Sequence, residues 1–201
     1  MTKPLKLVVV NSSLNQNSLS WQAAQAVANN IKNVHANAEV SLLDLNQTPF
    51  ATTTLNAVDG FKSFLTKVNS DYYINLLKNT DVLIIGAPMS NFGYSSVLKN
   101  FIDGICVAEK TFSYKYAGKH RSIGYLDNLS VLLVGTQGAP ADWYPFGNHL
   151  KQLEGTFRFL GVNKINSLLI AGTKTAAYAG LSNAEILQKV ENDLLELAKK
   201  H

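Results

Sequence analysis

The sequence predicts a single α/β domain over residues 1–201, built on a five-stranded parallel sheet with helices on both faces. Three observations predict it. Five short runs are rich in Val, Leu and Ile, amphipathic stretches lie between them, and no linker or repeat interrupts the alternation. With 46% hydrophobic residues among 201, the chain has enough apolar material for one sizeable core.

The expected strands and helices alternate along the chain. Continuous apolar runs predict strands at residues 5–10, 39–43, 81–87, 130–135 and 164–171. Helical spacing of apolar residues predicts helices at 18–32, 95–109, 147–160 and 183–200, with a further helix at 60–78. This order is typical of a doubly wound sheet with strand order 2-1-3-4-5.

Charge, cysteine content and hydropathy argue against several classes of protein. The 18 Lys and Arg residues are scattered, which favours a solvated surface over a nucleic-acid site. The single cysteine, Cys106, cannot form an internal disulfide and is expected as a small buried hydrophobe rather than a redox thiol. No apolar stretch approaches the ~20 residues that span a bilayer. We therefore expect a cytoplasmic protein with neither a membrane nor a nucleic-acid partner.

Motifs for hydrolase and zinc chemistry are missing from the sequence. The four histidines have no metal-ligand spacing, so we expect them at the surface and expect no metal site. Their positions are His35, His120, His149 and His201.

In a doubly wound sheet, ligands bind at the carboxyl ends of the strands, where the strand order reverses. This rule directs attention to the loops after the first, third and fourth strands: NSSLNQNSLS at 11–20, PMSNFGY at 88–94 and GTQGAP at 135–140.

The first loop favours a phosphate site without a cation. Residues 11–50 contain no glycine, which excludes the glycine-rich dinucleotide and nucleotide-hydrolase loops here. Ser12, Ser13, Ser18 and Ser20 instead place hydroxyls at a helix start, where free backbone N–H groups and the helix dipole attract anions. The alternative is that Ser18 or Asn17 only caps the helix.

The second and third loops favour a flat polar ring as ligand. Pro88 is expected to end the strand ladder, and Gly93 to supply the freedom for a sharp turn. Backbone amides and the Asn91 side chain can then meet the ring edge-on, with Phe92 nearby, while Gly138 permits close approach from the other side. A phosphate site beside two amide-rich loops indicates flavin mononucleotide, FMN.

Several of these motifs together resemble the FMN-dependent NADH-azoreductase and quinone reductase family, which has a flavodoxin-like fold. The resemblance rests on NSS at 11–13, SLS at 18–20, PMSNFGYSSVLKNFID at 88–103, Thr111-Phe112 with Tyr114, and TQGA at 136–139. It implies an FMN-dependent oxidoreductase that passes two electrons from NADH or NADPH to quinones or azo compounds in a ping-pong reaction. The chemistry then belongs to the flavin, and no side chain is a required acid or base.

The resemblance also assigns cofactor-binding residues. The phosphate segment corresponds to Ser13, Ser18, Leu19 and Ser20, the ring-contacting segment to Met89, Ser90, Asn91 and Phe92, and the second flavin loop to Thr136, Gln137, Gly138 and Ala139. In the last loop, the amides of Gln137 and Gly138 are expected to stabilise the reduced ring. Two departures affect side-chain contacts and substrate preference: Ser90 stands where the family has tyrosine, and TQGA where it has SRGG.

Members of this family resemble homodimers with each active site at the subunit boundary. The alternating aromatics Phe112, Tyr114 and Tyr116 suit a loop that reaches across this boundary, the alternative being an ordinary exposed hairpin. The residues expected on the substrate side are Phe112, Tyr114, Trp143 and Phe159. Trp143, with Tyr144 and Phe146, could equally well cover the core.

Two other functions remain open from the sequence. One is a flavodoxin-type electron carrier, which the basic composition suits less well, and the other is an NAD(P)H-dependent reductase of free flavin. The choice between NADH and NADPH and the physiological acceptor also stay open.

Overall fold

A computed structural model describes residues 3–115 and 122–201. Its main sheet has five parallel strands in the order β2-β1-β3-β6-β7, which confirms the predicted order 2-1-3-4-5. The strands are β1 (Lys6–Asn11), β2 (Glu39–Asp44), β3 (Val82–Pro88), β6 (Ser130–Thr136) and β7 (Lys164–Ile170). A separate antiparallel pair joins β4 (Phe112–Ser113) to β5 (Ile123–Gly124).

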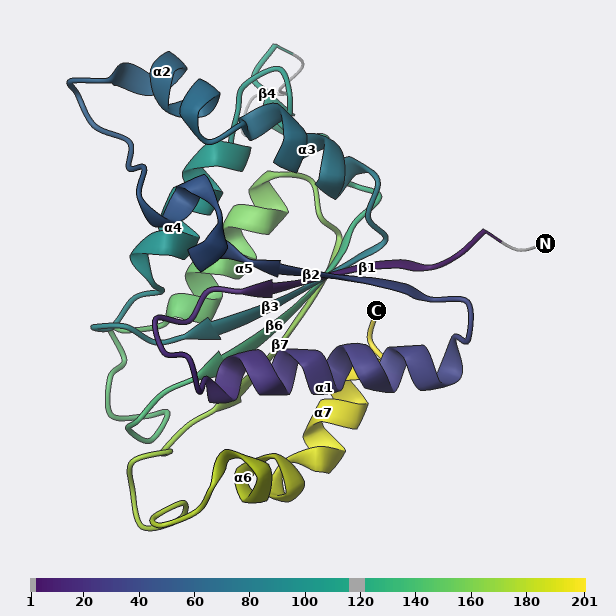
Figure 1. Cartoon of the computed structure of the whole chain (residues 1–201), viewed down its shortest axis with the longest axis vertical. Coiled ribbons are helices and arrows are strands. Elements are labelled where there is room, and N and C mark those ends of the chain that lie inside the picture. Colours follow the sequence, from purple (N-terminus) through teal and green to yellow (C-terminus); the bar gives the residue numbers. More distant parts are fainter. Residues whose placement is uncertain (1–2, 116–121) are drawn as a thin grey trace.

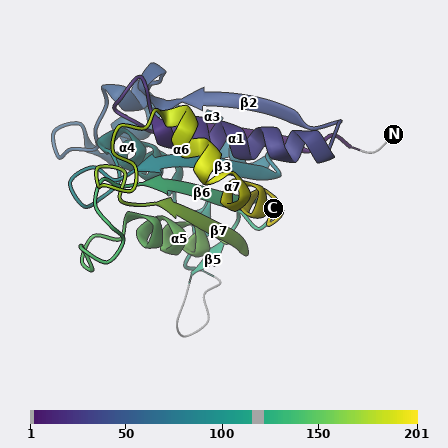
Figure 2. The ribbon, with the colours of Figure 1, turned by 90° about the horizontal axis from the view of Figure 1, so that it is seen from below.

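Helices cover both faces of the sheet. In Figure 1, α1, α6 and α7 lie below it, while α2 to α5 lie above, and Figure 2 shows the first group from its own side. The helices are α1 (Leu19–Val34), α2 (Gly60–Lys67), α3 (Ser70–Lys78), α4 (Ser96–Ile105), α5 (His149–Phe159), α6 (Asn183–Lys189) and α7 (Glu191–Ala198), with short 3-10 helices at Leu45–Gln47 and Pro49–Ala51.

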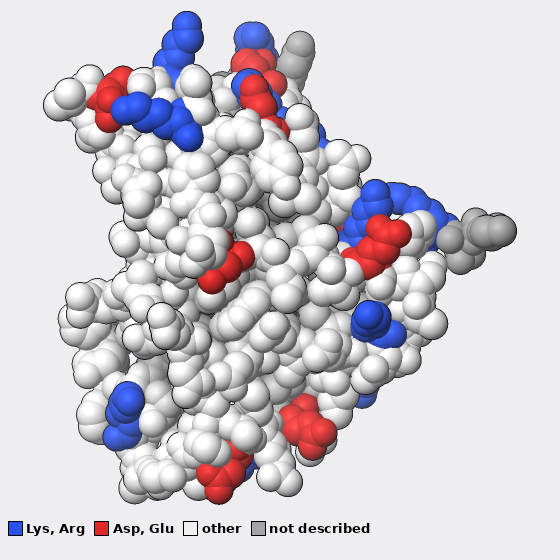
Figure 3. All heavy atoms as spheres, in the orientation of Figure 1, with Lys and Arg blue, Asp and Glu red and all other residues white. Residues whose placement is uncertain are grey.

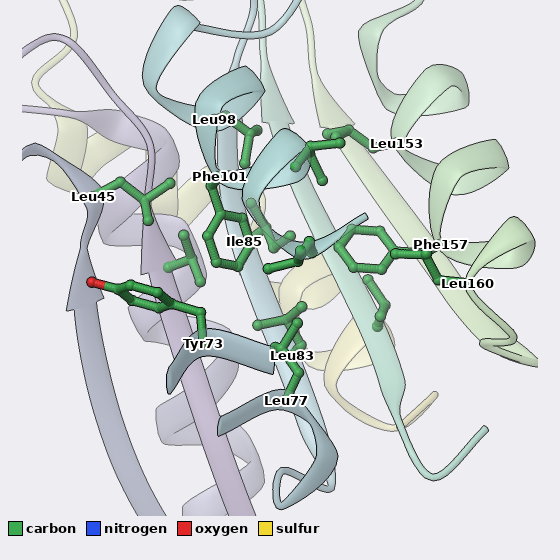
Figure 4. Packing of buried hydrophobic residues seen from close by; sticks show 14 of the residues in the cluster. Leu45, Tyr73, Leu77, Leu83, Ile85, Leu98, Phe101, Leu153, Phe157 and Leu160 are labelled. Atoms are coloured by element: carbon green, nitrogen blue, oxygen red, sulfur yellow. The ribbon is translucent and has the colours of Figure 1, made fainter. Parts of the chain in front are cut away.

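The three central strands are buried on both faces, so their side chains divide between two cores. Alternate residues of each strand point to opposite faces of the sheet. Val8, Leu83 and Leu133 therefore pack with α4 and α5, whereas Val9, Ile84 and Leu132 pack with α1 and α7. Figure 4 shows the first core, where Phe101 of α4 and Phe157 of α5 converge on Ile85 of β3.

Two expected helices are each divided in two. The helix predicted at 60–78 ends at Lys67 and restarts at Ser70, because Asn69 takes a left-handed conformation with φ of 53°. The helix predicted at 183–200 breaks at Val190, whose ψ of 13° is not helical. The apolar spacing continues through both breaks, so hydrophobic periodicity alone did not reveal them. The helix expected at 95–109 ends earlier, at Ile105.

None of the helices in the described part of the chain combines the length and the apolar character that a membrane crossing requires.

Candidate functional site

The first predicted loop places two buried hydroxyls at the start of α1. Ser18 caps the helix, because its Oγ accepts a hydrogen bond from Trp21 N at 3.2 Å, and it lies 3.0 Å from Ser20 Oγ. Capping and phosphate binding are compatible, since the backbone N–H groups of Leu19 and Ser20 donate to no acceptor in the described residues. The first turn carries no acidic side chain. An anion therefore meets free donors and the positive end of the helix dipole.

The two earlier serines hold the loop in shape. Ser12 Oγ donates to the carbonyl of Gly86 at 2.8 Å, and Ser12 O accepts from Ser95 Oγ at 2.6 Å. Ser13 N donates to Asn11 Oδ1, while Asn46 Nδ2 donates to Ser13 O at 2.8 Å. These bonds tie the loop after β1 to β3, to the start of α4 and to the segment after β2.

Gly86 allows α1 to start directly against β3. A Cβ atom on this residue would lie 2.7 Å from Ser20 O and 3.0 Å from Ser20 C, both backbone atoms. The close approach sets the position of the helix start that carries the unpaired donors. Gly86 was not among the predicted site residues, although a glycine inside an apolar strand signals such an approach.

The second loop is a tight turn over Ser90–Gly93, and its geometry corrects the expectation that Gly93 supplies the freedom to turn. The backbone N–H and C=O of Ser90 pair with those of Gly93, at 2.8 and 3.1 Å. Asn91 and Phe92 take the positive φ values, 45° and 71°, whereas Gly93 does not. The turn thus has the φ signs of a type I′ turn, which suits asparagine at its first central position.

Pro88 is the last residue of β3, as expected, and is itself paired with Thr136 of β6. Met89 N still donates to Thr136 O at 2.8 Å. Because successive residues of a strand point their backbone groups to alternate sides, the proline nitrogen faces the side where β1 has already ended at Asn11. In the described residues the Asn91 and Phe92 amides have no acceptor, so they remain available to a ligand.

The third loop is braced by the segment after β7, and this corrects the expected role of Gln137. Its backbone N donates to Ile170 O at 3.0 Å, and its side-chain Nε2 donates to Ala139 O and Pro140 O. The Gln137 amide is therefore engaged in the fold and cannot stabilise a reduced ring as predicted. The amides of Gly138 and Ala139, in contrast, donate to nothing in the described residues.

We call the three loops that carry these unpaired donors, at 11–20, 88–94 and 135–140, the donor loops. They lie together at the carboxyl ends of the strands, on the left of Figure 1. The same edge carries few charged side chains in Figure 3. Larger hollows of about 460 and 530 Å³ lie elsewhere, beside α1 and β2 and at the amino ends of the sheet. The unpaired donors mark the candidate site, because an extended ligand can bind along an open edge without a deep cavity.

Aromatic side chains flank the second loop. The Phe92 ring lies 5.1 Å from that of Tyr144 and 5.0 Å from that of Phe146, between ring centroids. Trp143, on the same segment as these partners, is 61% exposed. A small cavity of about 80 Å³ lies beneath this segment, against Gln137 and His149. Trp143 is thus near the donor loops and does not cover the core.

The other three residues expected on the substrate side form a separate cluster. The Phe112 ring lies 4.7 Å from Phe159 and 5.3 Å from Tyr114, between centroids. Phe159 ends α5, whereas His149 begins it beside the donor loops, so the cluster lies about 15 Å further along the helix. Within one chain, this cluster therefore does not reach the donor loops. Tyr116, the third expected aromatic, lies outside the described residues.

His149 is buried and not at the surface as expected. It is 1% exposed, and its Nε2 lies 2.9 Å from Ala87 O, which ties the start of α5 to the end of β3. Burial lowers the pKa of the imidazole below 6.5 in spite of the carbonyl beside it. His149 therefore stays neutral near pH 7, with its proton on Nε2. His35 and His201 are half-buried, and His120 lies outside the described residues.

This burial predicts an acid-sensitive contribution to stability. Below pH 6.5, His149 binds a proton in the unfolded chain, whereas burial disfavours its protonation in the folded chain. The free energy of unfolding should therefore fall as the pH drops below 6.5. His149 contributes at most about 1.4 kcal/mol per pH unit to this decline, over the range between its pKa in the unfolded chain and its pKa in the folded chain. His149→Gln keeps a side-chain N–H donor but removes the titratable group. Denaturant unfolding from pH 7.5 to 5 should show a steeper decline in the wild type, and equal slopes would contradict this role.

Cys106 is half-buried against the core. Burial, followed by the nearby Asp103 carboxylate, raises the pKa of its thiol to about 11. The thiol is protonated at neutral pH and offers no thiolate for redox chemistry. Within residues 3–115 and 122–201, no group of three or more His, Cys, Asp or Glu side chains is arranged to hold a metal ion.

The strand order β2-β1-β3-β6-β7, with unpaired donors over the point where it reverses, defines a flavodoxin-like α/β protein. The chain belongs to the flavodoxin-like fold family, whose model matches residues 5–195.

Curated relatives match nearly the whole chain. The FMN-dependent NADH:quinone oxidoreductase 1 of Mesoplasma florum is 41% identical over 97% of this chain and 98% of its own. The FMN-dependent NADH:quinone oxidoreductase of Mycoplasmopsis synoviae is 39% identical over the same shares.

Solved structures share the fold at low identity. The crystal structure of azoreductase AzrA has a TM-score of 0.79 at 20% identity, covering 98% of this chain and 100% of that one. An FMN-dependent NADH-azoreductase from Bacillus anthracis in complex with FMN has a TM-score of 0.76 at 21% identity, covering 97% and 98%. At this identity the likeness establishes the fold.

Proposed function

We propose that this chain is an FMN-dependent NAD(P)H oxidoreductase that reduces quinones and azo compounds by two-electron, ping-pong hydride transfer. The observation that carries the proposal is the set of unpaired amides and hydroxyls on three loops over the point where the strand order reverses. Relatives about 40% identical over nearly the full chain, named as FMN-dependent NADH:quinone oxidoreductases, support the same activity. Of the two donors, their names favour NADH.

The residues present fit FMN. Ser18, Ser20 and the free amides at the start of α1 would hold the phosphate, with Ser13 and Leu19 beside them. The turn at 89–92 and the loop at 136–139 would meet the ring, the first through the Asn91 and Phe92 amides and the second through those of Gly138 and Ala139. When bound, FMN supplies the hydride chemistry, while the protein positions the ring and donates hydrogen bonds to it.

Steady-state kinetics test the proposed reaction. Because donor and acceptor react in turn at one ring, varying NADH at several fixed quinone concentrations should give parallel double-reciprocal lines. Intersecting lines would contradict the ping-pong scheme. Negligible NADH oxidation with a stable one-electron form would indicate an electron carrier, and release of reduced FMN would indicate a free-flavin reductase.

Ser90 is expected to set acceptor size. Its backbone is fixed by Gly93, and its side chain makes no hydrogen bond among the described residues, so a larger side chain can be added without breaking the turn. Ser90→Tyr should keep the flavin spectrum, narrow the pocket beside the ring and shift preference toward small quinones. Burying an aromatic ring against a ligand is worth on the order of 1 kcal/mol, which corresponds to several-fold changes in kcat/KM.

The measurement is the ratio of kcat/KM for a fused-ring quinone and for a small quinone, in wild type and variant. Loss of FMN, or an unchanged ratio, would show that residue 90 does not border the acceptor.

We infer that the working form is a homodimer in the cytoplasm. The cluster of Phe112, Tyr114 and Phe159 exposes aromatic surface, with Tyr114 67% exposed, yet lies far along α5 from the donor loops of its own chain. A second copy could bring this cluster to those loops. Sedimentation should give twice the chain mass of 21.9 kDa. A monomer with full activity would contradict the inference.

A further inference from the structure

We propose a second site, for a divalent late transition metal such as Zn²⁺, Ni²⁺ or Cu²⁺, between His35 and His201. The two Nε2 atoms lie 3.2 Å apart, and the rings are 5.1 Å apart at 84°. Zinc lies about 2.0–2.1 Å from each imidazole nitrogen, so two nitrogens of a tetrahedral zinc site are about 3.3 Å apart. The observed spacing matches this geometry. Water would complete the coordination.

The Nδ1 atom of His201 makes the kind of hydrogen bond that is typical of a metal-binding histidine. Its Nδ1 lies 2.5 Å from the carbonyl oxygen of Ala198 and so carries the proton that it donates to this carbonyl. The Nε2 of the neutral ring is then left with a free lone pair, the tautomer that metal-binding histidines adopt when a backbone carbonyl holds the other nitrogen. Without metal, His35 Nε2–H donates to this lone pair. With metal, His35 carries its proton on Nδ1, and the cation replaces the shared proton.

The surrounding backbone favours a cation. His35 caps the C-terminus of α1, and His201 follows the C-terminus of α7, whose last residue is Ala198. The negative ends of two helix dipoles therefore meet at the histidine pair. The nearby cations Lys32, Lys199 and Lys200 are exposed, and Lys199 pairs with Glu196. Imidazole ligands select late transition metals, whereas Mg²⁺ and Ca²⁺ prefer oxygen.

The site is distinct from the donor loops. α1 has 16 residues, so its C-terminus lies about 24 Å from the Ser18 end. Since α1 and α7 pack together, an ion bound to both C-termini would hold these two helices to each other (Figure 1). Binding should therefore raise thermal stability without changing the flavin spectrum.

Calorimetry on the full chain, purified without a histidine tag, tests the proposal with Ni²⁺, Zn²⁺ and Cu²⁺. One ion should bind per chain, with Cu²⁺ tightest. His35→Gln and His201→Gln keep a hydrogen-bonding side chain but remove the imidazole, and each should weaken binding at least about tenfold. Asn33→Ala, on the same helical turn as His35, should leave affinity unchanged, and Mg²⁺ should not compete.

Two further readouts identify the ligands. The electron paramagnetic resonance spectrum of the Cu²⁺ complex should show two imidazole nitrogens in the wild type, and one in each glutamine variant. At an ion concentration of 100 times Kd, Tm should rise by roughly 5–10 °C. Absence of binding would show that the pair is only a hydrogen bond. Binding that stays as tight in both glutamine variants as in the wild type would place the ion elsewhere. Either result overturns the proposal.

Discussion

Replacing Ser18 and Ser20 together by alanine should weaken FMN binding by on the order of a hundredfold or more. Both hydroxyls are buried at the start of α1, 3.0 Å apart, beside amides that have no other acceptor. A hydrogen bond to a charged group is worth about 1.5–3 kcal/mol, and the variant loses two. Fluorescence titration of the apoprotein with FMN measures the change.

Riboflavin separates phosphate binding from helix capping. It lacks the phosphate, so its affinity should fall far less in the double variant, even though the lost cap costs about 1 kcal/mol of stability. The matched variant Ser41→Ala/Ser167→Ala removes two hydroxyls from the edge strands β2 and β7 and should leave both affinities unchanged. Equal weakening of FMN and riboflavin would mean that Ser18 and Ser20 act only on the helix.

Gly86→Ala should destabilise the fold and displace the phosphate site. Its Cβ would meet the backbone of Ser20 at 2.7 Å, and backbone cannot move aside as a flexible side chain can. Overpacking of this kind costs typically about 1–3 kcal/mol. Thermal unfolding should show a fall in Tm of about 2–4 °C for each kcal/mol lost, together with weaker FMN binding.

Gly155→Ala is the matched control for this effect. Gly155 lies inside α5 with nothing within 4 Å of an added Cβ atom. Alanine is favoured over glycine in a helix by about 0.8–1.0 kcal/mol, so this variant should be more stable than the wild type. If Gly86→Ala left both Tm and FMN affinity unchanged, the close approach of α1 to β3 would not set the position of the site.

The strand order was predictable because each central strand is buried on both faces. A run such as Val82–Ile85 has no polar alternation, and in an α/β chain this pattern indicates a parallel strand covered by helices. The breaks at Asn69 and Val190 were not predictable in this way. They depend on single backbone conformations, which hydrophobic spacing does not record.

The candidate site was predictable at the level of loops but not of individual donors. Parallel strands bring their carboxyl ends to one edge, so three loops far apart in sequence could be placed together. Which amides are free depends on tertiary bonds, as at Gln137, whose amide is taken by Ile170. The burial of His149 was missed for the same reason, because its partner is a backbone carbonyl of another element, Ala87.

The most direct test of flavin-dependent hydride transfer is the visible spectrum of the purified protein under anaerobic conditions. We expect a yellow protein that NADH bleaches and that a quinone then restores, with no stable one-electron form between the two states. A colourless protein that cannot be reconstituted with FMN would contradict the account.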